Sequence, residues 1–471
     1  HAEIARKCML EKDLIIGNAL VDMYSKCGSL SKAKEAFDKL LVRDSISWNI
    51  LIFGYTMHDH GKEALMCFEQ MQREGVSLTT FTYVSVLKAC GISLDTEKGK
   101  EIHSQITRKG LLETDDLVGN MLVDMYGRCG SLAEAQVVFD KLLVHDVISW
   151  TALILGYVKC QSCEKALNLY KRMQLEGVCP NTVTYICILK ACSSSRTLEK
   201  GLEIHVQIDP NMLLRDNTIG NSLMDVYTRC GSLARARQVF HMCHIRDMVS
   251  WNILMVGYAD HGYYEEVLNC YNQMQSEGVV RTSASFICGL KACGSIQAIN
   301  KGKELHEEII EKQMLQSNVS VGNALINMYI QCAFLLEAWK TFDKLPVRNR
   351  LTWITLISGY VKYKFLDGAL NLCQYMLIEE ASTEESRDTS NCFSRSEFID
   401  SEGLVTSSML VNVYAECGLL AEAQKVFDGV PVRDVVLWTS LMAGYVKHEW
   451  LEEALDCYEQ MQMEGISPDT V

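Results

Sequence analysis

The sequence predicts an all-α superhelix built from repeated pairs of helices. Three observations lead to this prediction: a pattern that recurs about every 102 residues, apolar residues at helical spacing within each recurrence, and only 5 Pro in 471 residues. Two short amphipathic helices cannot bury their own apolar faces, so neighbouring pairs must stack and share a continuous core. The chain length is then the length of an array, which needs no single globular core.

Three kinds of repeat tile the chain with little remainder. Strings related to GNALVDMYSKCGSL begin at Gly17, Gly119, Gly220 and Gly322, with spacings of 102, 101 and 102 residues. Strings related to SWNILIFGY surround Trp48, Trp150, Trp251 and Trp353, and strings with LKAC begin at Phe81, Val183 and Ala284. The 31-residue repeats are 14–44, 116–146, 217–247, 319–349 and 404–434; the 35-residue repeats are 45–79, 147–181, 248–282, 350–384 and 435–469; the long repeats, of 35 or 36 residues, are 80–115, 182–216 and 283–318.

Each repeat is predicted to form two helices. In the repeat 45–79, apolar residues recur at a spacing of three to four on either side of Gly61, and Gly75 ends the second run. Most prolines fall between repeats, where they do not interrupt a helix.

One segment interrupts the array. We predict a partial long repeat over 1–13, complete repeats over 14–384, a degenerate acidic segment over 385–403, two more repeats over 404–469, and the start of another at 470–471. Residues 379–403 have no helical period and carry 8 acidic against 2 basic residues, which is typical of a flexible loop. The segment is the remnant of a shortened repeat or an artefact of how the chain was assembled from its gene.

Composition excludes several classes of protein. The chain is 48% hydrophobic with a formal net charge of −14, which is too apolar and too weakly charged for general disorder. It has no run of about 18 apolar residues, so no membrane span is predicted. Its acidity argues against a nucleic-acid binder that works by charge alone. Because the first residue is His1, we expect the natural start to be missing, and a targeting segment is therefore not expected within this sequence.

The 35-residue repeats follow the pattern VxSWNxLIxGYxxxGxxEEALxxYxxMxxEGxxPN. This pattern resembles the pentatricopeptide repeat (PPR) family. The KACG of the long repeats and the MYxxCGSL of the 31-residue repeats resemble its plant organellar PLS subclass. The resemblance covers essentially the whole chain except 385–403. It implies a right-handed superhelical solenoid, similar to tetratricopeptide arrays, whose first helices line the concave face.

The resemblance also implies that each repeat recognises one base of single-stranded RNA through its fifth and last residues. Asn offers a donor and an acceptor that suit a pyrimidine, whereas Ser or Thr is shorter and suits a purine. The expected pairs are Asn18/Asp44, Asn49/Thr79, Asn120/Asp146, Thr151/Asn181, Asn221/Asp247, Asn252/Thr282, Asn323/Asn349, Ser408/Asp434 and Thr439/Asp469. In this order, from the 5′ end of the RNA, they imply U, a pyrimidine, U, A, U, a pyrimidine, C or U, G and G.

Other positions have different expected roles. The long repeats carry Val84, Ile186 and Ile287 at the fifth position, and apolar side chains there predict spacers without base recognition. Ile354 departs from the pattern of the 35-residue repeats. The second residue of each repeat would hold bases by apolar contact, as at Ile46, Leu117, Ile148, Val249 and Val436. The thirteenth residue offers candidate phosphate contacts, or solvated cations at a helix end, at Lys26, Arg128, Lys159, Arg229, Lys362 and Lys447.

No catalytic or metal site is predicted. A cytidine deaminase needs HxE and PCxxC, and the HxE that begins at His306 shares its repeat position with His103 and His205, so this histidine is expected to pack. The pair Cys160 and Cys163 has metal-like spacing but no second pair of ligands. The recurring tryptophans are expected in the core. The chain is therefore predicted to be neither an enzyme nor dependent on a cofactor.

These observations predict a sequence-specific binder of organellar single-stranded RNA, located in a mitochondrion or chloroplast by family resemblance. Its expected role is the recognition step of C-to-U editing, with a separate deaminase or editing cofactors as partners and no membrane or small-molecule substrate. One alternative is a scaffold that binds proteins, as tetratricopeptide arrays do. Another is a truncated, inactive relic.

Overall fold

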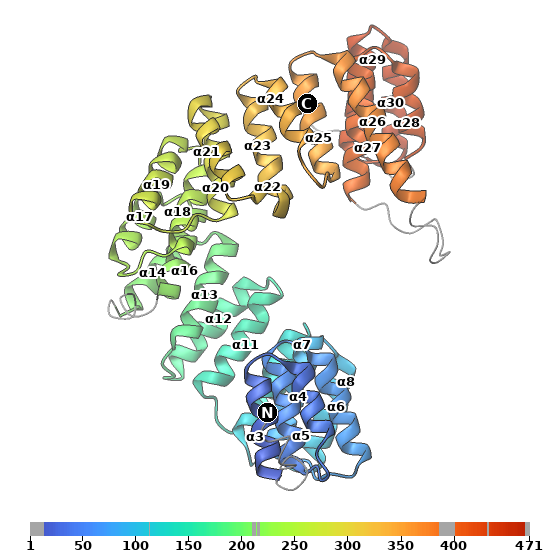
Figure 1. The fold of residues 1–471 in the computed structure, drawn as a ribbon. Coiled ribbons are helices and arrows are strands. Elements are labelled where there is room, and N and C mark those ends of the chain that lie inside the picture. The colour runs from blue at the N-terminus through green and yellow to red at the C-terminus, as the bar shows by residue number, and fades with distance from the viewer. Residues whose placement is uncertain are drawn as a thin grey trace. The chain divides into compact units, whose positions relative to one another are not determined.

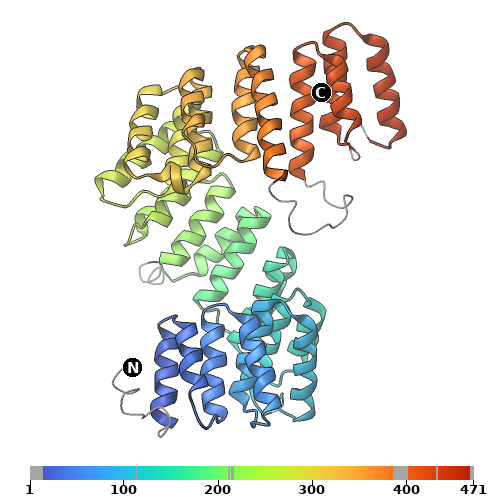
Figure 2. The same ribbon diagram turned by 45° about the vertical axis from the view of Figure 1, so that its right-hand side comes forward.

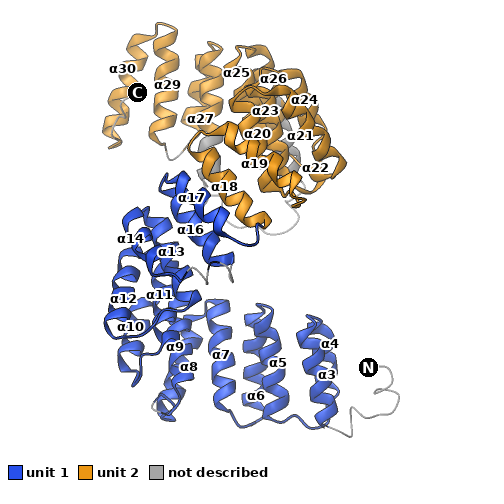
Figure 3. Ribbon diagram, turned by 90° about the vertical axis from the view of Figure 1, so that its left-hand side faces the viewer, with its two compact units in different colours: residues 1–246 blue, residues 247–471 orange. Residues whose placement is uncertain are grey.

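Helices make up the regular structure of this chain. The computed structural model describes residues 14–112, 114–209, 213, 217–385, 401–430 and 433–466, and over these ranges it has 27 α-helices and no strand. Figures 1 and 2 show successive helices running back and forth as hairpins. This confirms the predicted all-α fold. The chain divides into two compact units, 1–246 and 247–471 (Figure 3).

In the first compact unit, each repeat contributes a first and a second helix. The first helices are α3 (Leu14–Lys26), α5 (Ser45–Met57), α7 (Thr80–Ser93), α9 (Asp116–Arg128), α11 (Val147–Lys159), α13 (Thr182–Ser195) and α16 (Asn217–Arg229). The second helices are α4 (Leu30–Asp38), α6 (Gly61–Arg73), α8 (Thr96–Arg108), α10 (Leu132–Lys141), α12 (Cys163–Leu175), α14 (Leu198–Gln207) and α17 (Leu233–Met242).

The second compact unit has the same construction. Its first helices are α18 (Met248–Asp260), α20 (Ser283–Ser295), α23 (Val319–Gln331), α25 (Arg350–Lys362), α27 (Ser401–Glu416) and α29 (Val435–Lys447). Its second helices are α19 (Tyr264–Ser276), α21 (Ile299–Glu311), α24 (Leu335–Asp343), α26 (Leu366–Glu385), α28 (Leu420–Asp428) and α30 (Leu451–Met463), and the short α22 (Met314–Ser317) precedes α23.

Within each compact unit the first helices form one layer and the second helices form another. Each first helix packs on the first helix of the next repeat, as α3 does on α5 and α9 does on α11, and also on its own second helix. The helices α9 and α11 approach closely at two glycines, where a Cβ added to Gly156 would lie 2.8 Å from the Cα of Gly127. Glycine at these two positions therefore lets successive first helices pack backbone to backbone.

A tryptophan lies at the fourth position of every 35-residue repeat, and in four of these repeats it packs on a phenylalanine of the preceding 31-residue repeat. Trp48, Trp150, Trp251, Trp353 and Trp438 are all buried, which confirms their predicted place in the core. The Trp150 ring meets Phe139 of the preceding repeat edge to face, with ring centroids 4.6 Å apart. The pairs Phe37/Trp48, Phe342/Trp353 and Phe427/Trp438 have the same centroid distance. A buried tryptophan cannot stack on a base, so these rings serve the fold.

Helical structure extends farther into the acidic segment than its sequence period predicted. We expected 379–403 to lack helices, but α26 continues through Glu385 and α27 begins at Ser401. Glutamate and alanine, which make up five of the seven residues in 379–385, are strong helix formers, so the helix continues without a periodic apolar stripe. The intervening residues 386–400 lie outside the described ranges. No helix over the described residues is long and apolar enough to cross a membrane.

Candidate nucleic-acid interface

The fifth residue of a 31-residue repeat lies against the last residue of the same repeat. In 116–146, the Asn120 Nδ2 donates to both carboxylate oxygens of Asp146, at 3.3 and 3.2 Å. In 319–349, the Asn323 Nδ2 donates to the Asn349 Oδ1 at 3.4 Å. Asn18 also hydrogen-bonds Asp44. The structure therefore brings these predicted pairs together through direct contacts between their side chains.

The last residue of a repeat also begins the next helix. Asp146 is the N-cap of α11 and accepts from the backbone N–H groups of Ile148 and Ser149, at 3.0 and 2.7 Å. Asp44, Thr79, Asn181, Asp247, Thr282, Asn349 and Asp434 cap their helices in the same position. Burial would raise the pKa of Asp44, but hydrogen bonds from Ser47 and Asn18 outweigh burial and hold this pKa below its usual value.

The sequence interpretation missed this capping role. Asp, Asn, Ser and Thr are the residues preferred at N-caps, and a hydroxyl three residues later completes a capping box in four of these helices. The identity of the last residue therefore has a structural cause that would hold for any two-helix array. Recognition of a ligand has to be argued from the fifth residue.

The asparagines at the fifth position of four 31-residue repeats keep a buried acceptor free. The Oδ1 atoms of Asn18, Asn120, Asn221 and Asn323 are buried and have no hydrogen-bond partner among the described residues. Asn120 and Asn323 are only 4% and 8% exposed. Asp146 can only accept, so the Asn120 amide nitrogen has to face it, and the amide oxygen is left without a donor. A buried polar atom without a partner is uncommon in proteins, and an ordered water or a ligand can supply the missing donor.

The fifth residues of two 35-residue repeats are arranged differently. The Asn49 Nδ2 donates to the Thr79 Oγ1 at 3.1 Å, and its Oδ1 accepts from the Thr82 hydroxyl at 2.8 Å. Asn252 makes the equivalent bonds to Thr282 at 3.0 Å and Ser285 at 2.7 Å. These amides therefore have both ends engaged within the protein.

The four remaining predicted pairs differ in their contacts. Thr151 reaches Asn181 through Thr184, whose Oγ1 lies 2.7 Å from the Thr151 Oγ1 and 2.9 Å from the Asn181 Oδ1. Asn221 and Asp247 belong to different compact units, and Asp469 lies outside the described residues. Ser408 is buried, and the Thr439 hydroxyl donates to the Val435 carbonyl. The apolar fifth residues Val84, Ile186, Ile287 and Ile354 are half-buried.

Apolar side chains flank the fifth residues at the surface. The second residues expected to hold bases, Ile46, Leu117, Ile148, Val249 and Val436, are 43% to 58% exposed. An exposed aliphatic residue one turn before a buried amide provides an apolar contact beside a polar one. This arrangement suits a planar, polar-edged ligand such as a nucleobase.

Most candidate phosphate contacts are already paired. Lys26, Arg128 and Arg229 bind the aspartate four residues earlier, Asp22, Asp124 and Asp225, at 2.7, 2.7 and 3.0 Å. Lys447 pairs with Glu416, and Lys362 donates to the Gln331 Oε1 at 2.9 Å. Lys159 has no carboxylate within 4 Å among the described residues. Such exposed pairs contribute little to stability, so a phosphate can compete for these cations.

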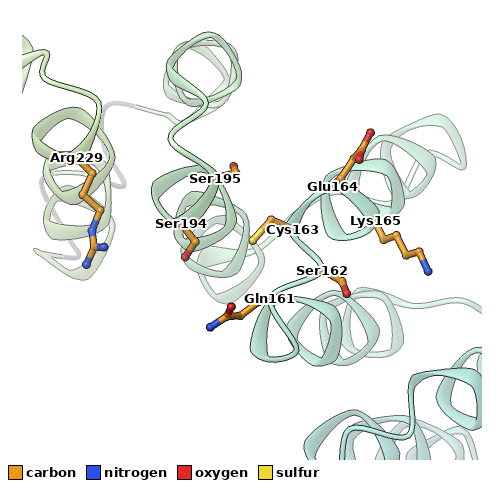
Figure 4. A pocket seen from close by; sticks show the side chains of 8 residues that line it. All are labelled: Gln161, Ser162, Cys163, Glu164, Lys165, Ser194, Ser195 and Arg229. Carbon is orange, nitrogen blue, oxygen red and sulfur yellow. The ribbon is translucent and has the colours of Figure 1, made fainter. Parts of the chain in front are cut away.

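A hollow of about 600 Å³ lies at the same ends of the first helices. Figure 4 shows its lining side chains, among them Gln161, Cys163, Lys165, Ser194, Ser195 and Arg229. Two cations and several hydroxyls make it polar. Cys160, considered above as half of a metal site, is exposed while Cys163 is buried, and no group of three His, Cys, Asp or Glu suited to a metal occurs among the described residues.

The recurring histidines pack as predicted. His103, His205 and His306 place their Nδ1 atoms 3.0, 2.6 and 2.7 Å from the hydroxyls of Tyr126, Tyr227 and Tyr329. Burial lowers the pKa of all three imidazoles. The same contact at three equivalent junctions accounts for His306 without a catalytic role.

Sequence models of a known repeat family match this chain at positions that coincide with its repeats. A sequence model of the PPR repeat family matches residues 43–91, 145–194, 246–295 and 433–471, and a model of the PPR repeat matches 18–45, 120–147, 351–379 and 405–434. A chloroplastic pentatricopeptide repeat-containing protein of Arabidopsis thaliana is 29% identical over 100% of this chain and 78% of its own length. A mitochondrial one is 31% identical over 98% of this chain and 62% of its own length.

Solved structures share the fold. The pentatricopeptide repeat protein PPR10 from maize matches 97% of this chain and 69% of its own with a TM-score of 0.60 and 18% identity. PPR10 in complex with an 18-nt psaJ RNA element matches 97% of this chain and 75% of its own, with a TM-score of 0.56 and 16% identity. At these identities the likeness shows the helical fold alone.

Proposed function

This chain belongs to the pentatricopeptide repeat family, and from that premise we propose that it binds single-stranded RNA in a sequence-specific way. The observation that supports this most is the set of buried, unpartnered Oδ1 atoms of Asn18, Asn120, Asn221 and Asn323. Their recurrence at one position of successive repeats predicts a polymeric ligand with one donor group per repeat. A nucleic-acid strand has that periodicity.

The geometry around Asn120 favours uracil. Asp146 holds the amide nitrogen, which leaves the Oδ1 to accept from the N3–H of uracil and the second amide N–H to donate to a uracil carbonyl. Cytosine has an acceptor at N3 and would face the amide oxygen without a hydrogen. Leu117 and Ile148, both exposed, would contact the faces of the same base. The 31-residue repeats that pair Asn with Asp are therefore proposed to select uracil.

The finer role is proposed from the resemblance of the repeat pattern to the PLS subclass. In this proposal each repeat binds one base, the chain is a member of the PLS subclass, and it carries out the recognition step of C-to-U editing. A separate deaminase or editing cofactors are its partners. The named relatives are chloroplastic and mitochondrial, which supports an organellar RNA as the ligand. The cations at the thirteenth position, including Arg229, which lines the polar hollow, are proposed to bind phosphates.

Selection of RNA from a randomised pool tests this function. Three repeats fill each period of about 102 residues, so one base per repeat places the uracils selected by Asn18, Asn120 and Asn221 three nucleotides apart. We expect enriched sequences to carry uracil at every third nucleotide over this stretch. A pool that shows no enrichment, or enrichment without a three-nucleotide spacing, would contradict the proposal and favour a protein-binding scaffold.

A further inference from the structure

The third residue of a repeat differs in its contacts between the two kinds of junction. Where a 31-residue repeat precedes, this residue bonds only the cap: Ser47 Oγ donates to the Asp44 Oδ1 at 2.8 Å, and Thr352 Oγ1 donates to the Asn349 Oδ1 at 2.7 Å. Where the preceding repeat is a 35-residue repeat that ends in a threonine cap, the third residue donates to the amide at the fifth position of that preceding repeat. Thr82 bonds Asn49 at 2.8 Å, and Ser285 bonds Asn252 at 2.7 Å.

The kind of cap explains this difference. An Asp or Asn cap offers an oxygen that accepts the hydroxyl of the third residue, as in Asp44 and Asn349. The shorter Thr79 has one oxygen, which already meets the Asn49 Nδ2 at 3.1 Å and the Thr82 backbone N–H at 3.3 Å. The Thr79 and Thr82 hydroxyl oxygens also lie 3.0 Å apart, and with Thr79 as the donor of that bond the Thr82 hydroxyl hydrogen is directed to the Asn49 Oδ1.

We infer that the hydroxyls of Thr82 and Ser285 are specificity-determining groups that disfavour uracil and favour cytosine at the bases facing Asn49 and Asn252. This inference rests on the proposed function. Each hydroxyl occupies a lone pair of the amide oxygen, for which a uracil N3–H then has to compete. The second amide N–H stays available and suits the N3 acceptor of cytosine. The family rule gives only a pyrimidine for Asn paired with Thr, and this contact orders the two pyrimidines.

Thr82→Val tests the inference, because valine keeps the shape of threonine and removes the hydroxyl. The base facing Asn49 lies two nucleotides to the 5′ side of the uracil facing Asn120, with one spacer between them. The experiment compares the dissociation constants of two RNAs that differ only by U or C at this nucleotide. We expect the variant to shift the ratio toward uracil by roughly three- to tenfold, the range that one hydrogen bond contributes.

Thr352→Val is the matched control. Both threonines are fully buried, and each accepts from the backbone N–H of its cap in a capping box, at 3.0 Å for Thr82 and 3.2 Å for Thr352. Both variants should therefore lose similar thermal stability. Only Thr82→Val should change the preference for U or C, because the Thr352 hydroxyl donates to the cap Asn349 and not to the Asn323 amide.

A second pair guards against a variant that fails to fold. Ser285→Ala should shift the preference at the base facing Asn252, and Ser47→Ala should leave the base facing Asn18 unchanged. An unchanged U-to-C ratio in Thr82→Val or Ser285→Ala, with uracil still selected opposite Asn120, overturns this inference alone. Loss of base selection in the unmodified chain overturns the proposed function as well.

Discussion

Trp150→Ala is expected to lower the free energy of unfolding by about 3–5 kcal/mol, the usual cost of truncating a fully buried tryptophan. The ring has no exposed surface, meets the Phe139 ring, and lies beneath the Arg172 guanidinium, which is 5.3 Å from its centroid. The cavity would open between two repeats, so the loss should reach the junction of α9, α10 and α11. Equilibrium unfolding in denaturant measures it.

Leu175→Ala provides the control for this change. Leu175 lies at the end of α12 in the same compact unit but is 87% exposed, so its truncation should change the free energy of unfolding by less than about 0.5 kcal/mol. A similar, small effect of both substitutions would show that the tryptophan junction does not hold the array together.

Asp146→Ala is expected to have two separate effects, because one carboxylate caps α11 and orients Asn120. Loss of the cap should cost about 1 kcal/mol of stability. Loss of orientation lets the amide rotate, so the preference for uracil over cytosine opposite Asn120 should fall roughly tenfold, within the range of a bidentate contact. Thermal unfolding measures the first effect, and binding of RNAs with a single base change measures the second.

Asp95→Ala separates these two effects. Asp95 caps α8 and accepts from the Lys98 backbone N–H at 3.0 Å, but α8 is a second helix and carries no predicted recognition residue. Its loss should reduce stability by a similar amount and leave base preference unchanged. Equal changes of base preference in both variants would mean that capping, and not orientation of Asn120, controls binding.

The fold was predictable because the same sequence pattern recurs along the chain. Spacing of the tryptophans and glycines sets the length of each repeat, and most first helices begin at the first residue of a predicted repeat, as Ser45 and Val147 do. The ends of the acidic segment were not predictable from the spacing of apolar residues. Helix propensity in 379–385 extends α26 without an apolar stripe, so a search for periodicity does not detect it.

The candidate site was predictable by position but not by contact. The sequence shows that Asn occupies the fifth position at both Asn120 and Asn49, and nothing in the two residues themselves distinguishes them. Their difference comes from their partners: Asp146, at the end of the same repeat, leaves the Asn120 amide oxygen free, and Thr82, in the following repeat, engages the Asn49 amide oxygen. Whether a carboxylate or a hydroxyl lies within hydrogen-bond distance of each amide depends on how the helices pack.

The most direct test of base recognition is the preference for U or G at the nucleotide facing Asn120, measured for the unmodified chain and for Asn120→Thr. Replacing the amide by the shorter threonine hydroxyl removes the free Oδ1. The Asp146 carboxylate is then able to accept a hydrogen bond from the base. The account predicts that preference moves from U toward G at this nucleotide, while the neighbouring nucleotides keep theirs. A uniform loss of affinity for every base at an unchanged melting temperature would contradict it.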